Sequence, residues 1–87
     1  MYEYRIRPGA LRDLDDIWLF IALDNVDAAD EWVERLMNQI QLLAKNPVIG
    51  HARYGGRKYG ALRFWPYERY VIIYFTTDDA VVVVAVS

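Results

Sequence analysis

The chain has 87 residues, no cysteine and a formal net charge of −2, and 55% of its residues are hydrophobic. This length allows one domain with one core, and the apolar content favours a folded globule over a disordered segment. Without cysteine there is no disulfide framework and no thiolate metal site, and no apolar stretch reaches the ~20 residues that a membrane span needs. We therefore expect a single cytoplasmic domain over residues 1–87.

The charged residues are distributed unevenly. Residues 13–34 contain eight acids and no base, whereas residues 45–69 contain six bases and one acid, Glu68. Such a molecule has a strong dipole, and its basic half is expected to meet an acidic partner. The simpler interpretation is that both runs are solvated surface. The sequence leaves both interpretations open.

A change in hydrophobic period marks the N-terminal elements. The period-two pattern of a half-buried strand runs through Tyr2, Tyr4 and Ile6, and Pro8-Gly9 is expected to end that strand. A helix is predicted next, with an apolar stripe at Leu11, Leu14, Ile17, Trp18, Ile21 and Ala22. Its first turns are expected to contain acids that favour the positive end of the helix dipole: Asp13, Asp15 and Asp16. Asp24-Asn25 should break this helix.

A longer helix is predicted to follow, with Asn25 or Asp27 as its N-cap and a stop at Asn46-Pro47. Its buried stripe is expected at Ala29, Trp32, Val33, Leu36, Ile40, Leu43 and Ala44. Two adjacent helices that are each apolar on one face should form an antiparallel hairpin lying on a sheet. Residues 46–60 contain four of the five glycines and no clean period, so a loop is predicted there.

Three strands are predicted in the C-terminal part, over residues 61–65, 69–76 and 81–86. A corner centred on Pro66 is expected between the first two, which places Arg63 and Arg69 close to that corner. Thr77-Asp78-Asp79 has the composition of a turn before the last strand, which is apolar on both faces as interior strands are. The predicted fold is α+β in the order β-α-α-β-β-β, with a helical hairpin packed on a largely antiparallel four-stranded sheet.

No metal or cofactor site is predicted. His51 is the one histidine, and no second His or Cys completes a metal site with it. Asp13 and Asp16 share a helix face, but dipole complementation explains them better than a magnesium site does. Acid–base cleavage of RNA would need groups that accept and donate protons, for which the candidates are tyrosines, arginines and His51. Arginine stabilises phosphoryl charge but is a poor base.

Basic residues interleaved with aromatic residues form the candidate contact surface. Nucleic-acid binding would explain this composition, but a pI of about 5.2 disfavours a protein whose task is to hold phosphates, so no direct DNA binding is expected. Arginine and aromatic residues also dominate the hot spots of protein–protein interfaces. We therefore predict a surface that contacts a protein partner, composed of Arg53, Arg57, Lys58, Arg63, Arg69 and Tyr70.

Short motifs follow one another along the chain in a particular order: Asp13-Leu14, Ile17, Phe20-Ile21, Leu43-Ala44, Pro47, Gly50, Leu62-Arg63 and the run from Arg69 to Phe75. In order and spacing they resemble the ParE branch of the RelE/ParE toxin family. The resemblance implies the toxin of a type II toxin–antitoxin system, held in a hetero-oligomer by a cognate antitoxin whose C-terminal segment wraps it. ParE-type members inhibit DNA gyrase, and RelE-type members cleave mRNA in the ribosome.

The resemblance also guides the choice of target. RelE-like cleavage relies on basic sheet residues, which Arg63 and Arg69 match, and on a Tyr or His in a C-terminal tail, whereas this chain ends in VVVVAVS. With no matched acid–base residue, we expect inhibition of DNA gyrase by binding, without a cofactor and without a reaction of its own. The alternative is a ribosome-dependent mRNA endonuclease that uses Arg63 and Arg69 as phosphate stabilisers. Since the tail is also an expected contributor to toxicity, the third interpretation is a non-toxic relic that binds antitoxin.

Overall fold

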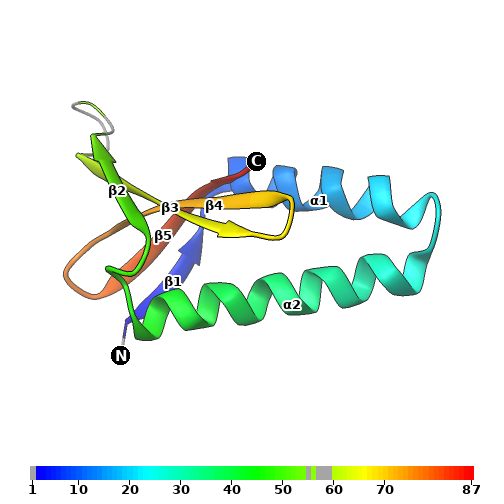
Figure 1. The fold of residues 1–87 in the computed structure, drawn as a ribbon, viewed down its shortest axis with the longest axis horizontal. Coiled ribbons are helices and arrows are strands. Elements are labelled where there is room, and N and C mark those ends of the chain that lie inside the picture. The colour runs from blue at the N-terminus through cyan, green and yellow to red at the C-terminus, as the bar shows by residue number, and fades with distance from the viewer. Residues whose placement is uncertain (1, 55, 57–59) are drawn as a thin grey trace.

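The computed structural model describes residues 2–54, 56 and 60–87, which form two helices and five strands (Figure 1). In chain order these elements are β1 (Glu3–Ile6), α1 (Pro8–Ala22), α2 (Val26–Lys45), β2 (His51–Tyr54), β3 (Ala61–Tyr67), β4 (Tyr70–Thr76) and β5 (Ala80–Val86). The helices form a hairpin that packs on the sheet, so the predicted α+β architecture is confirmed. The predicted strand count of four is wrong by one, because β2 joins the sheet.

The sheet has the strand order β1-β5-β4-β3-β2. β1 pairs in parallel with β5, and the other three pairs are antiparallel, which confirms the prediction of a largely antiparallel sheet. β5 lies between β1 and β4, as its apolar composition on both faces predicts. The first strand of the chain, β1, therefore has as its hydrogen-bonded neighbour β5, the strand farthest from it in sequence.

The structure corrects two predictions in the middle of the chain. β2 lies inside the predicted loop; all four of its residues are exposed, so they carry no apolar period that would indicate a strand. β3 continues through Pro66, which pairs with Val71, and the corner is instead the Glu68-Arg69 turn, where Glu68 has φ 54°. Proline is tolerated at this position because β2 pairs with β3 only as far as Phe64, so the far edge of β3 is open there.

The helix boundaries follow from local chemistry. α1 begins at Pro8, whose fixed φ suits the first turn of a helix, so Pro8-Gly9 starts this helix and does not form a separate turn. The predicted placement of acids in its first turns is therefore wrong for the first turn, which contains none. Asn25 is confirmed as the N-cap of α2, since its side chain accepts a hydrogen bond of 3.0 Å from the backbone N–H of Ala28. α2 ends at Lys45, just before the predicted stop.

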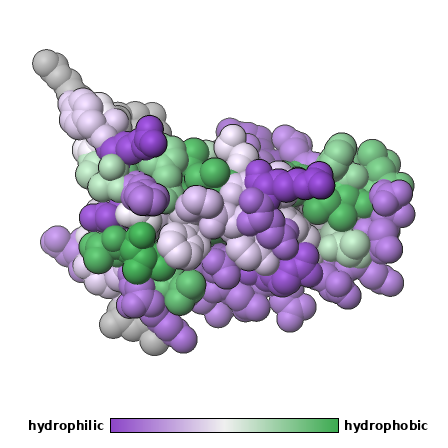
Figure 2. Space-filling view, viewed as in Figure 1, coloured by the Kyte–Doolittle hydropathy of each residue, from purple (hydrophilic) through white to green (hydrophobic). Residues whose placement is uncertain are grey.

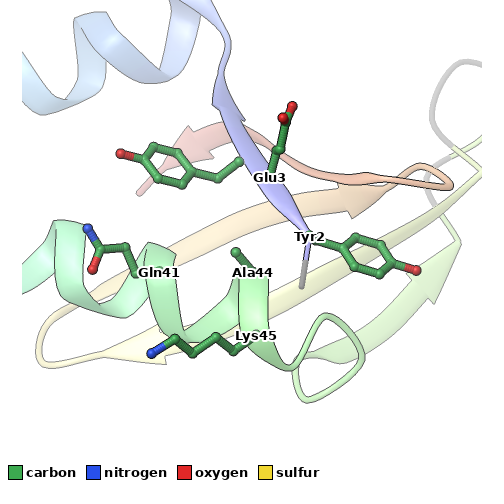
Figure 3. Close-up of a pocket in the computed structure, with 6 residues that line it drawn as sticks. Tyr2, Glu3, Gln41, Ala44 and Lys45 are labelled. Atoms are coloured by element: carbon green, nitrogen blue, oxygen red, sulfur yellow. The ribbon is translucent and has the colours of Figure 1, made fainter.

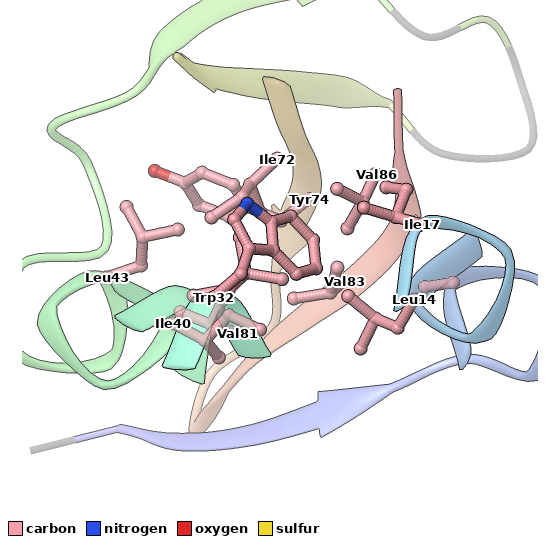
Figure 4. Close-up of a cluster of buried hydrophobic side chains, with 12 residues drawn as sticks. Leu14, Ile17, Trp32, Ile40, Leu43, Ile72, Tyr74, Val81, Val83 and Val86 are labelled. Carbon is pink, nitrogen blue, oxygen red and sulfur yellow. The ribbon is translucent and has the colours of Figure 1, made fainter. Parts of the chain in front are cut away.

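The core lies between the helical hairpin and one face of the sheet (Figure 4). α1 contributes Leu14 and Ile17, and the whole predicted stripe of α2 is buried except Val33, which is partly buried. Residues of β4 and β5 that face the helices complete the core: Ile72, Tyr74, Val81, Val83 and Val86. Each large apolar side chain buried in this way contributes about 1.5–3 kcal/mol. Since Leu11 is 48% exposed, it does not belong to the buried stripe that was predicted for α1.

The molecule is elongated, with principal extents of 39 × 25 × 20 Å. In Figure 1 the end of the helical hairpin where α1 turns into α2 projects beyond the sheet. The other end of α2 reaches the sheet, where the backbone N–H of Tyr2 donates to the carbonyl of Ala44 over 3.0 Å. The sheet and the turn of the hairpin therefore form opposite ends of the molecule. Among the described residues, neither helix has the length and apolarity needed to cross a membrane.

Candidate functional site

The sheet face opposite the helices carries a hollow of about 340 Å³. Its lining combines two basic or titratable side chains with apolar ones: His51, Arg53, Phe64, Pro66 and Val71. The registers His51↔Phe64 and Pro66↔Val71 bring these residues of three strands to one face. Both described helices pack on the other face, so we call this surface the open face.

Of the predicted contact residues that the structure describes, Arg53 alone lines this hollow. Its guanidinium carbon lies 5.8 Å from the centre of the Phe64 ring, a cation–π arrangement. Arg53 is exposed and has no acidic partner, since Arg35–Glu68 is the one ion pair among the described residues. Its positive charge is therefore available to an acidic or aromatic group of a partner.

Arg63 has a different position, because adjacent strand residues point to opposite faces of a sheet. It pairs with Ala52 and Tyr74, on the helix side, and its Nη1 donates to the carbonyls of Val48 and Gly50 at 3.0 and 2.9 Å. These bonds attach the segment that follows α2 to strand β3. The guanidinium of Arg63 thus holds the protein's own backbone.

Tyr74 holds the same segment from strand β4. Its hydroxyl donates to the carbonyl of Pro47 over 2.8 Å and accepts from the N–H of Gly50 over 3.1 Å. Burial raises the pKa of this hydroxyl above its ordinary value of 10.0, although the Gly50 hydrogen bond and the charge of Arg63 act in the opposite direction. With both hydrogen bonds made inside the protein, Tyr74 is poorly suited to exchange protons with a substrate. We call Arg63, Tyr74 and the segment 47–50 the clamp.

The remaining predicted contact residues do not gather around the hollow. Arg69 is exposed in the turn between β3 and β4. Tyr70 is partly buried and packs edge-on against Trp32, with ring centroids 5.1 Å apart and planes at 66°. Arg57 and Lys58 lie outside the described residues. Among the described members of the predicted set, the structure therefore brings only Arg53 to the open face. It lies there beside His51, which the prediction of a contact surface did not include.

The signal that points to His51 is its spacing. His51 and Arg53 are two residues apart, so in a strand they share a face, but the strand itself was not predicted. Its pairing with β3 then places this face beside the aromatic ring of Phe64. The sequence would have indicated this neighbourhood only if β2 had been identified.

A second hollow, of about 470 Å³, lies between β1 and the end of α2 (Figure 3). It is lined by Tyr2, Glu3, Tyr4, Gln41, Ala44 and Lys45. In Figure 3 the polar ends of the labelled side chains point in different directions, so they do not converge on one reacting atom. Nor do three His, Asp or Glu side chains come together as a metal site anywhere in the part of the chain that the structure describes.

Comparisons with known proteins agree with this architecture. The family model described as ParE toxin of type II toxin-antitoxin system, parDE, matches residues 4–87. A solved structure, described as the chromosomal ParDE TA system from P. aeruginosa, is similar over 100% of this chain and 95% of its own chain, with a TM-score of 0.77 and 18% identity. At this identity the likeness is one of fold. A comparison with curated proteins gave no match.

Proposed function

This chain belongs to the ParE toxin family of type II toxin–antitoxin systems, and on that premise we propose that it acts in the cytoplasm as a toxin that inhibits DNA gyrase by binding. We further propose that a cognate antitoxin holds it silent in a hetero-oligomer. The toxin performs no reaction of its own and needs no cofactor.

The position of Arg63 is the observation that favours inhibition by binding over cleavage of RNA. An endonuclease would use this arginine to stabilise charge on a phosphate, which requires the guanidinium to face the substrate. Here Nη1 of Arg63 donates to two backbone carbonyls, and the nearby Tyr74 hydroxyl is occupied by Pro47 and Gly50. The clamp therefore occupies the guanidinium of Arg63 and the hydroxyl of Tyr74, which an mRNA-cleaving site would need for contact with its substrate.

The open face supports the proposed antitoxin contact. It presents partly buried apolar residues, Phe64 and Val71, together with the unpaired charge of Arg53. A partner segment with apolar side chains and carboxylates would cover this surface, and arginine with aromatic residues is typical of interface hot spots. We propose that the antitoxin lies across this sheet and reaches the helical hairpin.

Two assays on the purified toxin test this function. We expect inhibition of DNA supercoiling by purified gyrase, with accumulation of the cleavage complex, and no cleavage of mRNA in a translating extract. Adding purified antitoxin should restore supercoiling, and Arg53→Ala should weaken the antitoxin complex. Cleavage of mRNA without inhibition of gyrase would reject the proposal. Activity in neither assay would identify a protein of the same fold that binds antitoxin but is not toxic.

One observation favours the endonuclease as the second candidate. His51 lies beside Arg53 in the hollow of the open face. An imidazole that moves a proton and a guanidinium that neutralises a phosphate are a minimal set for RNA cleavage. If mRNA is cleaved, His51→Ala and Arg53→Ala should each abolish cleavage.

A further inference from the structure

The turn of the helical hairpin carries four of the exposed large apolar side chains of the described residues. Leu23 is 80% exposed and Phe20 73%, and their neighbours Leu19 and Val26 are 53% and 52% exposed. We call these four residues the hairpin tip. Figure 2 shows apolar surface gathered at this end of the molecule, with polar surface around it. Exposed apolar side chains are normal when scattered, but a contiguous group marks an interaction site.

A hollow of about 550 Å³ adjoins the hairpin tip. It is lined by Phe20, Ile21, Leu23, Asp24, Asn25 and Ala28, so a carboxylate stands at its margin. The surrounding helical segment, residues 13–34, contains eight acids and no base. The hairpin tip is therefore an apolar surface in a negative field.

Two hydrogen bonds hold the hairpin tip in shape. Nε1 of Trp18 on α1 donates to Oδ1 of Asp30 on α2 over 2.8 Å, which braces one helix against the other. The Asn25 side chain caps α2 through the N–H of Ala28. Because the two helices are fixed, Phe20 and Leu23 cannot fold back to bury themselves in this molecule. A rigid exposed surface loses little entropy when a partner covers it.

Charge indicates which partner covers the hairpin tip. The open face carries unpaired Arg53 and fits an acidic partner, and the hairpin tip at the other end of the molecule has the opposite sign. One surface of uniform charge cannot complement both ends. RNA would be repelled from the acidic tip, whereas a protein cleft with an apolar floor and a basic rim would fit it.

We propose that the hairpin tip is the surface with which the toxin docks on its target protein, in an apolar cleft rimmed by lysine or arginine. This inference rests on the proposed function only in requiring that the chain is toxic. Phe20 and Leu23 enter the cleft, and the carboxylates around them meet its basic rim.

The test compares three variants expressed without antitoxin, with growth arrest as the readout because it needs no knowledge of the target. The double variant Phe20→Ser/Leu23→Ser removes the apolar contact, and Asp24→Lys reverses a charge at its margin. The matched control is Val48→Ser, since Val48 is 68% exposed on the segment that follows α2, away from the hairpin tip. Each variant is also co-expressed with antitoxin and analysed by gel filtration and thermal unfolding.

We expect the double variant to need about 100-fold more toxin for the same arrest, as the loss of two anchor side chains implies. Asp24→Lys should need about tenfold more, and Val48→Ser should behave as the wild type. All three should still form the antitoxin complex and unfold at the wild-type temperature. If the double variant proves unfolded, the charge variant decides the question.

Three results would overturn the inference: full toxicity of the double variant, loss of the antitoxin complex with retained toxicity, or no toxicity of the wild type. A supercoiling assay on the same proteins tests gyrase separately. If growth arrest depends on the hairpin tip but supercoiling by gyrase is not inhibited, the proposed docking surface is supported and gyrase is rejected as the target.

Discussion

The two ends of this molecule use their side chains in opposite ways. At the sheet end, Arg63 and Tyr74 make hydrogen bonds to the backbone of the segment 47–50, so groups suited to chemistry serve the fold. At the hairpin tip, Phe20 and Leu23 are suited to a core and are left in solvent. The comparison shows that residue type alone does not locate a functional surface. The polar side chains of Arg63 and Tyr74 stabilise the fold, whereas the apolar side chains of Phe20 and Leu23 are exposed and available to a partner.

The largest effect is expected from Gly50→Ala in the clamp. A Cβ at this position would lie 2.7 Å from the Tyr74 hydroxyl and 3.2 Å from Cβ of Arg63, so the clamp would have to open. We expect a loss of about 3 kcal/mol in the free energy of unfolding, measured with urea. Gly9→Ala is the control, because its Cβ would meet neighbours only at 3.8 Å. Equal effects of the two substitutions would contradict a tight clamp.

Tyr74→Phe should cost about 2 kcal/mol at neutral pH, because it leaves buried backbone groups of Pro47 and Gly50 without a partner. It should also change the pH dependence. The folded-state pKa of Tyr74 lies above the unfolded value of 10.0, so the unfolded chain loses this proton first. The wild type should therefore lose stability as the pH rises above 10.0, and more steeply than Tyr74→Phe. If the free energy of unfolding had the same pH dependence in the wild type and in Tyr74→Phe, burial would not raise the pKa of this hydroxyl.

Substitutions of Arg63 and Arg53 should have different effects on the free energy of unfolding, because Arg63 stabilises the fold and Arg53 is available to a partner. Arg63→Met should lower the free energy of unfolding by about 1.5 kcal/mol, since two carbonyls lose their donor. Arg53→Met should change it by less than about 0.5 kcal/mol, as expected for an exposed residue without an ionic partner. Urea unfolding of both variants makes the comparison, and a reversed order would mean that the two arginines have been assigned the wrong roles.

Small effects are expected from the two hydrogen bonds beside the hairpin tip. Asn25→Ala should cost about 1 kcal/mol through loss of the N-cap, and Trp18→Phe about 0.5 kcal/mol through loss of an exposed hydrogen bond to Asp30. Amide hydrogen exchange should show faster opening at the start of α2 in both variants, with the sheet unchanged. Protection lost equally in the sheet would mean that the hairpin tip does not open independently.

The sequence predicted those parts of the fold that have a local signal. The stripe of α2 and the Asn25 cap depend on spacing within one helix, and both appear in the structure. β2 was missed because its residues are exposed on both faces and become a strand only by pairing with β3. Strand pairing is a non-local property that no short window of sequence contains.

The candidate site was predicted less well than the fold, and strand register explains why. Arg53 pairs with Leu62, so Arg63, the next residue of β3, must point to the other face. From sequence the two arginines look equivalent, and a one-residue difference in pairing separates an available charge from a structural one. The acceptors of Arg63 lie on a segment that only the folded chain brings beside β3. The hydrophobic pattern left Phe20 and Leu23 outside the predicted stripe, but their residue types alone did not indicate an exposed contact surface.

The parallel pairing of β1 with β5 has a consequence for how the protein is made. Glu3 pairs with Ala80, so the first strand to be synthesised has no partner until β5 is available. Contacts between such distant parts of a chain form slowly, because a large loop must close before they give any stability. Until then the chain exposes apolar residues of α1 and α2 that later become core. The nascent chain therefore passes through a period in which its fold is incomplete, and the antitoxin proposed above would meet it during that period.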